Sequence, residues 1–364
     1  MDLGAGPFIE HIRAAAAGAT PLRIRGGGTK DFYGEPPQGE VLDTRSLAGI
    51  TSYEPSELVV TVGAGTPLSE LETLLAAQGQ CLPFEPPHFG DAATVGGMVA
   101  SGLSGPARAS AGSVREYVLG LTMVNGRGEL LTFGGQVMKN VAGYDVSRLM
   151  VGALGTLGLI VEVSLKVLPV APAEATLKFA MSQPEALRQL NLWGGQPLPL
   201  NASCWVEDAG IGTLFMRLRG AVAAVEAACR KLGGERQDNA VVAADWTSCR
   251  EQRLPWFAER GERDLWRLCV PQTAPVLELP EQPLVEWHGG QRWVRADRRQ
   301  ADRLRQVAAH CGGHATLFIA ANPQGAANSR FTPLDPVLYR IQRELKRQFD
   351  PAGIFNRGRL FTDF

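Results

Sequence analysis

Apolar residues recur at helical and strand spacings through the first half of the chain, and glycine-rich loops separate the runs. Spacings of three and four residues predict amphipathic helices, whereas β-branched runs and strict alternation predict strands. The elements predicted before residue 170 are a helix over 7–17, strands over 41–43 and 58–62, a helix from Pro67 that Gly79 ends, a hairpin of 117–124 with 129–133, a short helix from Val146 and a strand over 161–167.

Polar residues at the ends of these elements allow finer predictions. Thr66 is predicted to cap the helix that follows it, and Asp145 to cap the short helix, because their side-chain oxygens can accept backbone N–H groups. The alternation in the last strand predicts Val161, Val163, Leu165 and Val167 inward, with Glu162, Ser164 and Lys166 outward.

Prolines near residue 170 mark a change of pattern, after which strands and helices alternate roughly. The predicted elements are strands over 176–181, 202–207, 213–218, 265–270, 293–295 and 315–319, and helices over 184–193, 222–232, 298–311 and 335–348. The pattern between 233 and 264 is less regular. We expect an α+β protein in three parts: residues 1–170, an α+β cap over 171–330, and a C-terminal helix and segment over 331–364.

The bulk composition excludes several classes of protein. The chain has 364 residues and a formal net charge of −1, which gives no electrostatic reason to expect nucleic acid. No apolar run has the roughly 18 residues of a membrane span, and no signal-peptide pattern is present. The six cysteines are scattered without metal-ligand spacing, so we expect no iron–sulfur cluster. We expect a cytoplasmic protein, held at the inner face of a membrane only through partners.

Glycine is the unusual residue, since 27 of the 42 glycines precede residue 170. The loop Arg25-Gly26-Gly27-Gly28-Thr29-Lys30 follows an apolar run and is typical of an anion cradle, because consecutive glycines let backbone N–H groups converge. The alternative is a purely structural turn. A second turn, with Gly63, Gly65 and Thr66, joins a strand to a helix N-terminus. Neither loop completes the fingerprint G-x-G-x-x-G, so a Rossmann NAD site is disfavoured.

Two later segments are also rich in small residues. Residues 91–102 allow either close approach to a flat ligand or tight packing of a helix against a sheet. Gly155, Thr156 and Gly158 place a hydroxyl between glycines ahead of a buried strand. The first half therefore holds a series of polar backbone turns.

The order of these loops resembles the FAD-binding domain of the vanillyl-alcohol oxidase and p-cresol methylhydroxylase (PCMH) flavoprotein family. The segments that carry the resemblance are RGGGT (25–29), GAGTP (63–67), ATVGGMVASG (93–102), GSVREYVLG (112–120), GYDVSRLMVGALGTLGLIVEV (143–163) and FDPAGIFNRGRL (349–360). A closer resemblance, nearly end to end, is to the FAD-binding subunits of bacterial glycolate oxidases, through PFEPPHFGDAATVGGMVASGLSGP and FGGQVMKNVAGYDVSRLMVG.

The resemblance implies a PCMH-type domain of two α+β subdomains, with the FAD pyrophosphate on the first glycine loop. The residues that it implies for FAD binding are Arg25, Gly26, Gly27, Gly28, Thr29, Lys30, Gly63, Gly65, Thr66, Thr94, Val95, Gly96, Gly97, Met98, Ser101, Gly112, Ser113, Gly155, Thr156, Gly158, Ile160 and Asn356. Some relatives attach the flavin covalently, but no His or Cys stands in the first loop or over 102–112. We therefore expect noncovalent FAD, and a branched side chain at Gly27 is expected to abolish its retention without unfolding the cap.

The resemblance also implies partners, namely a second flavin subunit and an iron–sulfur subunit of a complex that oxidises glycolate, a small 2-hydroxy acid. In this interpretation the chain binds FAD and supports or relays electron transfer. Two alternatives stay open. One is a free-standing FAD-dependent 2-hydroxy-acid dehydrogenase or flavin reductase, and the other is a flavin-free scaffold subunit.

Few residues are candidates for catalysis. Oxidation of a 2-hydroxy acid needs a cation for the carboxylate and a base for the hydroxyl proton. The candidate bases are His88 and His314. Related dehydrogenases bind a metal through a histidine pair, but no histidine follows His314, so we expect no metal and favour a core or interface role for His314 over a catalytic one. Lys139 and Arg359 are candidate cations beside the flavin or, alternatively, surface charges.

Overall fold

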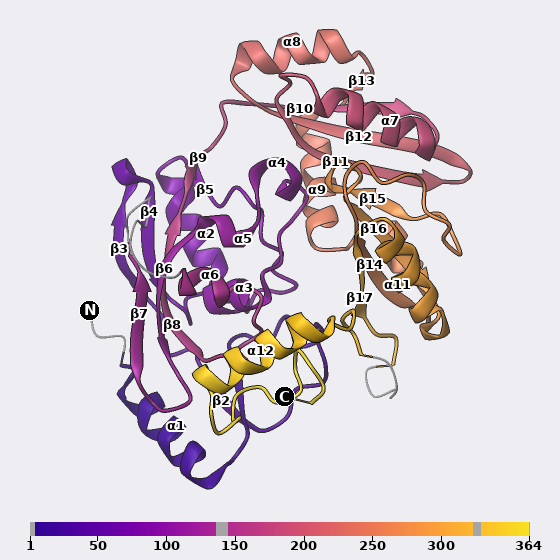
Figure 1. Ribbon diagram of the computed structural model, residues 1–364. Coiled ribbons are helices and arrows are strands. Elements are labelled where there is room, and N and C mark those ends of the chain that lie inside the picture. The colour runs from indigo at the N-terminus through magenta and orange to yellow at the C-terminus, as the bar shows by residue number, and fades with distance from the viewer. Residues whose placement is uncertain (1–3, 136–144, 323–328, 364) are drawn as a thin grey trace.

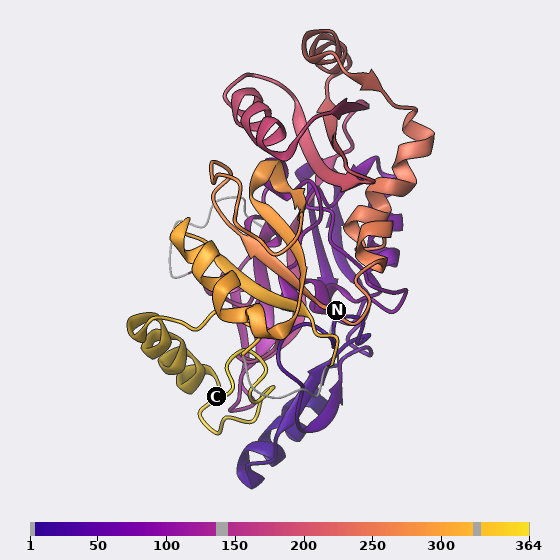
Figure 2. The same cartoon turned by 90° about the vertical axis from the view of Figure 1, so that its right-hand side faces the viewer.

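Two large antiparallel sheets dominate the computed structural model, which describes residues 4–135, 145–322 and 329–363. Figures 1 and 2 show the two sheets side by side, each with helices packed against it. The strands of the five-stranded sheet all precede residue 170, and those of the eight-stranded sheet all follow it. Antiparallel sheets with helices on their faces confirm the α+β class.

The first half forms the five-stranded sheet, in the order β3-β4-β8-β6-β7, and two small sheets, β1-β2 and β5-β9. Its elements are α1 (Gly6–Gly18), β1 (Leu22–Arg25), β2 (Glu40–Asp43), β3 (Ile50–Glu54), η1 (Pro55–Glu57), β4 (Val59–Gly63), α2 (Leu68–Ala77), β5 (Gln80–Cys81), α3 (Val95–Ser101), α4 (Arg108–Ala111), α5 (Val114–Tyr117), β6 (Val118–Val124), β7 (Leu130–Gly134), α6 (Val146–Leu149), β8 (Leu159–Lys166) and β9 (Leu168–Pro169). The predicted hairpin is confirmed as β6 paired with β7.

The second half forms the eight-stranded sheet, in the order β13-β10-β12-β11-β15-β16-β14-β17. Its elements are β10 (Ala173–Ala180), α7 (Gln183–Gly194), β11 (Leu200–Asp208), β12 (Ile211–Gly220), α8 (Val222–Leu232), β13 (Glu235–Arg236), α9 (Asn239–Arg250), α10 (Pro255–Ala258), β14 (Asp264–Cys269), β15 (Leu284–Glu286), η2 (Trp287–Gly289), β16 (Gln291–Ala296), η3 (Arg298–Gln300), α11 (Ala301–His310), β17 (His314–Ile319) and α12 (Pro336–Phe349). Helix α9 is an element that the irregular pattern of this region did not predict.

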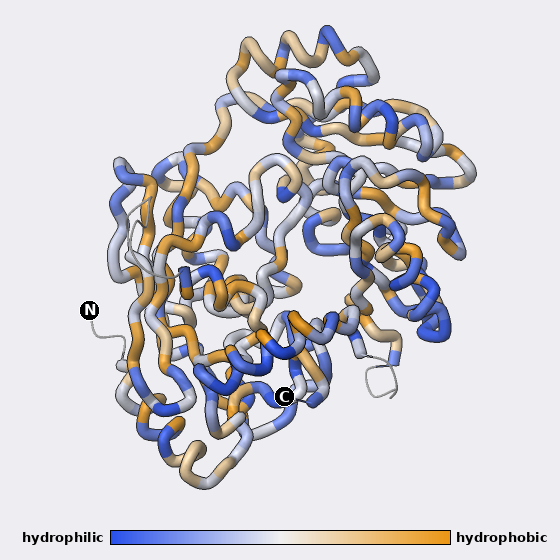
Figure 3. The backbone as a smooth tube through the Cα atoms, in the orientation of Figure 1, coloured by the Kyte–Doolittle hydropathy of each residue, from blue (hydrophilic) through white to orange (hydrophobic). Residues whose placement is uncertain are grey.

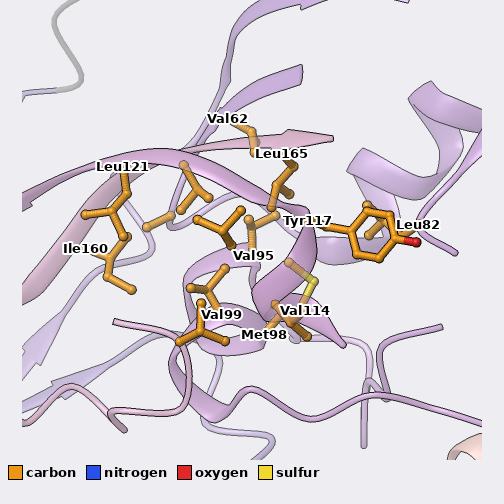
Figure 4. Close-up of a cluster of buried hydrophobic side chains, with 14 of the residues drawn as sticks. Val62, Leu82, Val95, Met98, Val99, Val114, Tyr117, Leu121, Ile160 and Leu165 are labelled. Carbon is orange, nitrogen blue, oxygen red and sulfur yellow. The ribbon is translucent and has the colours of Figure 1, made fainter. Parts of the chain in front are cut away.

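The core of the first half lies between the five-stranded sheet and helices α2 and α3. Figure 4 shows Val95, Met98 and Val99 of α3 directed at Val62 and Leu165 from the sheet. All five side chains are fully buried. Burial of such a side chain contributes roughly 1.5–3 kcal/mol, so this contact fixes α3 firmly on the sheet.

Two finer predictions are wrong. Helix α2 begins at Leu68 rather than Pro67, and the Thr66 hydroxyl accepts the N–H of Gly49 at 2.9 Å instead of capping the helix. Ser164 was predicted to face outward, but β8 lies at the centre of its sheet and both faces are covered. The Ser164 hydroxyl is buried and lies 2.9 Å from the hydroxyl of Thr61. The Asp145 cap is confirmed, because its carboxylate accepts the N–H of Arg148.

The eight-stranded sheet is covered on both faces. Helices α7 and α8 pack on β10 and β12, and α11 packs on β14 and β17. The opposite face contacts α9, α10 and residues of the first half that include Tyr33, Leu103 and Leu154. The second sheet is therefore joined to the first half through a shared apolar cluster.

The C-terminal segment returns to the beginning of the chain. Phe355 pairs in parallel with Leu22, which donates its N–H to Ile354 O at 2.7 Å. Before it, Lys346 of α12 is buried and donates from Nζ to Asp350 at 2.7 Å and to the carbonyl oxygens of Thr156 and Phe355. This buried ammonium fastens α12 and the C-terminal segment to the turn that precedes β8.

Candidate functional site

One open cleft, here called the glycine cleft, gathers most of the predicted cofactor-binding residues. Its walls come from β1 with the loop after it, from α3, from the turn before β8 and from the C-terminal segment. The predicted residues that line it are Arg25, Gly26, Gly27, Gly28, Thr29, Lys30, Thr94, Gly96, Gly97, Ser101, Gly155, Gly158, Ile160 and Asn356.

Unpaired backbone donors distinguish the loop of residues 26–30. Within the described part of the chain, none of the five backbone N–H groups from Gly26 to Lys30 has a hydrogen-bond acceptor. Gly28 has a φ of +73°, a conformation that side chains other than hydrogen disfavour. Successive free N–H groups around such a residue form the concavity that holds phosphate oxygens. The loop therefore fits the pyrophosphate of a dinucleotide.

Positive charge prevails around this loop, because four cations and one carboxylate line the cleft. Arg23 and Arg25 share the carboxylate of Asp31, with Arg25 Nε 2.8 Å from Oδ2. The Arg359 guanidinium donates only to backbone carbonyl oxygens of residues 30–35. Burial lowers the pKa of Arg359 to about 10, so the side chain stays protonated at neutral pH. Its interpretation as a surface charge is wrong, since Arg359 is 6% exposed.

Lys30 is the fourth cation of the cleft. Its Nζ donates to the carbonyl oxygen of His88 at 3.2 Å and lies 5.7 Å from the ring centre of Phe89. Burial lowers the pKa of Lys30 to about 8, and attraction to the carboxylate of Glu251 opposes that effect. The ammonium is therefore still mostly protonated at neutral pH.

Asn356 closes the cleft from the C-terminal side. Its Oδ1 accepts the N–H of Ile24 at 2.7 Å, and its Nδ2 donates to Leu154 O at 2.6 Å. Both ends of the amide are thus occupied by backbone. Asn356 holds β1 and the turn before β8 together and shapes the cleft through that contact.

Eight of the predicted residues do not line the cleft: Gly63, Gly65, Thr66, Val95, Met98, Gly112, Ser113 and Thr156. Their local roles are structural. Val95 and Met98 point into the core of the first half (Figure 4). Ser113 forms a capping box with Glu116 at the start of α5, and the Thr156 hydroxyl donates to Ala153 O at 2.7 Å.

At most of the glycines predicted to bind FAD, a side chain is excluded by another segment of the protein that lies close by. Space for a ligand is not the reason for glycine at these positions. A Cβ on Gly63 or Gly65 would lie 2.4 Å from a backbone oxygen of the 44–47 turn. A Cβ on Gly27 would lie 1.5 Å from Ala92 O, and one on Gly158 2.2 Å from the Met123 side chain. Gly97 differs, since its Cβ would meet only Thr94 Oγ1, at 3.2 Å, and would otherwise face open space.

The two candidate bases lie outside the glycine cleft. His88 has its Nε2 3.0 Å from the carboxylate of Glu72, and its backbone N–H donates to Glu251. His314 begins β17 and lines a separate cavity with Arg267 and Cys269. The candidate cation Lys139 lies outside the described residues.

Sequence reasoning missed several wall residues: Arg23, Asp31, Ala100 and Leu154. Two of them had a signal. Arg23 alternates with Arg25 along β1, so both side chains leave the strand on one face, and Asp31 follows directly after the glycine loop. Neither pattern showed that the three charges would meet.

The part of the chain that the structure describes lacks two further features. No group of three or more His, Cys, Asp or Glu residues there is arranged to hold a metal ion. No helix among the described residues has the length and apolar character needed to cross a membrane.

Comparison with known proteins defines the class. A family model described as an FAD binding domain matches residues 8–134, which include the glycine loop, β4 and α3. FAD is therefore the cofactor of this class of protein, and the unpaired donors of the cleft fit its pyrophosphate.

The particular family follows from a full-length relative. The chain is 44% identical over 356 residues to glycolate oxidase subunit GlcE of Escherichia coli (strain K12), covering 98% of this chain and 97% of that protein. The chain belongs to the family of this glycolate oxidase subunit. It is also 35% identical over 161 residues to D-lactate dehydrogenase of Archaeoglobus fulgidus, covering 43% of this chain and 35% of that protein.

A solved structure supports the fold alone. Alkyldihydroxyacetonephosphate synthase superposes with a TM-score of 0.64 and 15% sequence identity, covering 96% of this chain and 73% of that chain. The expected family and the PCMH-type fold are confirmed by these comparisons.

Proposed function

We propose that this chain is the FAD-binding subunit of a glycolate-oxidising complex and that it holds FAD noncovalently in the glycine cleft. The observation that carries the proposal is the row of unpaired backbone N–H groups over residues 26–30. The full-length similarity to glycolate oxidase subunit GlcE supports the substrate and the membership of a complex.

Different residues of the cleft would bind different parts of FAD, according to their chemistry. The N–H groups of residues 26–30 would bind the pyrophosphate, with Arg359 supplying positive charge behind them. Gly97 and Ser101 of α3 leave room for the flat parts of FAD, and Gly155 offers backbone to the adenosine half. FAD, once bound, supplies the acceptor for a hydride. No Cys, His or Tyr is among the described wall residues, which supports noncovalent binding.

Electrons that reach FAD must be transferred to another acceptor. We propose an iron–sulfur subunit as that acceptor and a second flavin subunit as a neighbour. The chain is 32% identical over 159 residues to glycolate oxidase subunit GlcD of Bacillus subtilis, covering 43% of this chain and 34% of that protein. Two proteins to which this chain is similar are therefore named as subunits of glycolate oxidases. This supports a role in relaying electrons beside a sister flavin subunit.

Helix α12 supports an assembly through its exposed apolar face. Val337, Leu338 and Ile341 are 56%, 49% and 49% exposed, while the residue that α12 buries is Lys346. Figure 3 shows hydrophobic and hydrophilic positions interleaved along α12 at the front of the molecule. An amphipathic helix that turns its apolar side outward gains stability when a partner covers it. We propose that another subunit of the complex covers this face.

The test is to purify the chain alone and together with candidate subunits, and to record the visible flavin spectrum before and after adding glycolate. The proposal expects flavin in the isolated chain, released by acid, and bleaching by glycolate that is fast only in the complex. Fast bleaching of the isolated chain would instead support the free-standing dehydrogenase. A chain that never takes up FAD, alone or in the complex, would support the scaffold.

A further inference from the structure

A second cavity, of about 420 Å³, lies where the loop before α4 faces the eight-stranded sheet. We call it the arginine cavity. Its walls include Ser104 and Arg108 from the first half, and Arg267, Cys269, Trp287 and His314 from the second. Two cationic side chains and a histidine thus face a space between the two halves of the molecule.

Arg267 is a partly buried arginine of the eight-stranded sheet, and its guanidinium lies over the rings of Tyr33 and Phe318. It lies on β14 opposite Trp293 and Thr316, so it projects from the middle of the sheet. Its Nη2 donates to the hydroxyl of Tyr33 at 3.0 Å, and its buried Nε has no hydrogen-bond partner. Within the described residues it forms no ion pair with a carboxylate, and the groups that act on its charge are Tyr33 and Cys269. Burying a charge in this way is costly unless a ligand or partner compensates it.

Arg108 supplies the second positive charge. Its guanidinium stacks on the ring of Trp287, 4.5 Å from the ring centre, which orients the side chain at the cavity mouth. None of the described residues that line the cavity is an aspartate or a glutamate. The cavity is therefore electropositive, and an anion is the ligand that this lining favours.

The thiol of Cys269 responds to this positive charge. Burial raises the pKa of Cys269, but Arg267, a hydrogen bond with His314 and Arg108 together outweigh that effect and lower it. The same positive charges would stabilise a carboxylate placed in the cavity. Cys269 also gives a chemical probe of whether the cavity is occupied.

The arginine cavity adjoins the glycine cleft. Ala100 and Ser101 line the glycine cleft, and Gly102 and Ser104 line the arginine cavity. The two sites are thus lined by neighbouring residues at the C-terminal end of α3. A small acid in the cavity would thus lie next to the cofactor site.

We propose that Arg267 and Arg108 bind the carboxylate of a small organic acid in the arginine cavity, at the end of α3. That the acid is a 2-hydroxy acid, or the 2-oxo acid formed from it, rests on the proposed function. The chain then binds the acid itself, and the sister flavin subunit is not the only place in the complex that takes the substrate or product.

The test measures the rate at which iodoacetamide alkylates Cys269, followed by mass spectrometry of the Cys269 peptide. The full-length chain is titrated with glycolate, glyoxylate and, as a separate arm, inorganic phosphate. The proposal expects glycolate or glyoxylate to slow the alkylation of Cys269 and to leave the half-buried Cys229 unaffected. Because Arg267→Gln removes a charged hydrogen-bond donor, it should raise the half-protecting concentration about tenfold or more.

Three controls make the outcome decisive. Arg299→Gln makes the same chemical change at an arginine that is 89% exposed and paired with Asp297. In this variant the acids should protect Cys269 from alkylation as they do in the wild type. Arg108→Gln alters an exposed residue and keeps the test valid if Arg267→Gln fails to fold. Flavin content is recorded in every sample, so loss of FAD counts against the proposed function and unchanged alkylation counts against the cavity.

The inference is overturned if neither acid slows the alkylation of Cys269, or if both arginine variants are protected as well as the wild type. Protection by phosphate at lower concentration than by either carboxylate would also overturn it. Protection by glycolate in a chain that holds no FAD would support the cavity and refute the proposed function.

Discussion

Gly97 offers a way to block the glycine cleft without disturbing the fold. It lies in α3, lines the cleft, and its N–H donates to Thr94 Oγ1 at 3.2 Å. A side chain at Gly97 would meet only that hydroxyl, at 3.2 Å from its Cβ, and otherwise open space. We therefore expect Gly97→Val to abolish FAD retention while the protein remains folded.

The effect of Gly97→Val on the free energy of unfolding and its effect on FAD affinity should have opposite signs. Glycine is about 1 kcal/mol less favourable than alanine inside a helix, and valine is intermediate, so the variant should keep or slightly raise its free energy of unfolding. Forcing extra methyl groups against a bound ligand costs about 1–3 kcal/mol or more. Since 1.4 kcal/mol corresponds to a factor of ten, the dissociation constant of FAD should rise roughly tenfold to a hundredfold or beyond.

The assay is titration of flavin-free protein with FAD, together with thermal unfolding of the same samples. Gly194→Val is the matched control, because Gly194 ends α7 in the second half and its Cβ would meet nothing within 4 Å. Gly27→Val is a poorer choice than the sequence suggests, since its Cβ would lie 1.5 Å from Ala92 O and displace the loop itself. If Gly97→Val binds FAD as tightly as the wild type, the glycine cleft is not the FAD site.

Three further predictions follow from buried or exposed groups. Lys346→Met leaves the Asp350 carboxylate buried without its ion-pair partner, so urea unfolding should show a loss of about 3–5 kcal/mol, and a loss below 1 kcal/mol would contradict the role of the pair. Burial lowers the pKa of His288 to about 4 from 6.5, so the unfolded chain binds the proton more readily and stability should fall as pH drops below 6.5. That loss should reach about 2 kcal/mol between pH 7.5 and pH 5 and be absent in His288→Gln, as urea titrations at both values can show. The double change Leu338→Glu and Ile341→Glu should weaken assembly with the other subunits in size-exclusion chromatography, without lowering the melting temperature of the isolated chain; unchanged assembly would exclude α12 as the docking face.

The fold could be predicted well where local chemistry decides it. The hairpin of β6 and β7 follows from Asn125-Gly126 between two alternating runs, and the cap of α6 follows from Asp145. Helix α9 was missed although Val242, Trp246 and Cys249 are its buried residues at helical spacing. Exposed Val241 beside them obscured that stripe.

The site could be predicted in part, because the glycine loop lies next to a strand end and its consecutive glycines are recognisable in the sequence. What the sequence could not show is which neighbour each glycine accommodates. Gly63 and Gly158 are pressed against other backbone or side chains, whereas Gly97 faces the cleft. That difference depends on contacts between segments far apart in the chain.

Long-range contacts also decide where two of the arginines lie. Arg359 is separated from Lys30 by most of the chain, yet its guanidinium donates to the carbonyl oxygen of Lys30. Arg267 reaches Tyr33 in the same way, across the junction of the two halves. Neither pairing leaves a periodic or local trace, so both required the folded structure.

The most direct test of the account is the flavin content of the purified chain. Protein prepared with FAD present is freed of excess cofactor, its visible spectrum is recorded, and acid is then used to separate flavin from protein. We expect stoichiometric FAD that acid releases completely, from the wild type and from Gly194→Val, and almost none from Gly97→Val. A wild-type chain that remains colourless and takes up no FAD would contradict it.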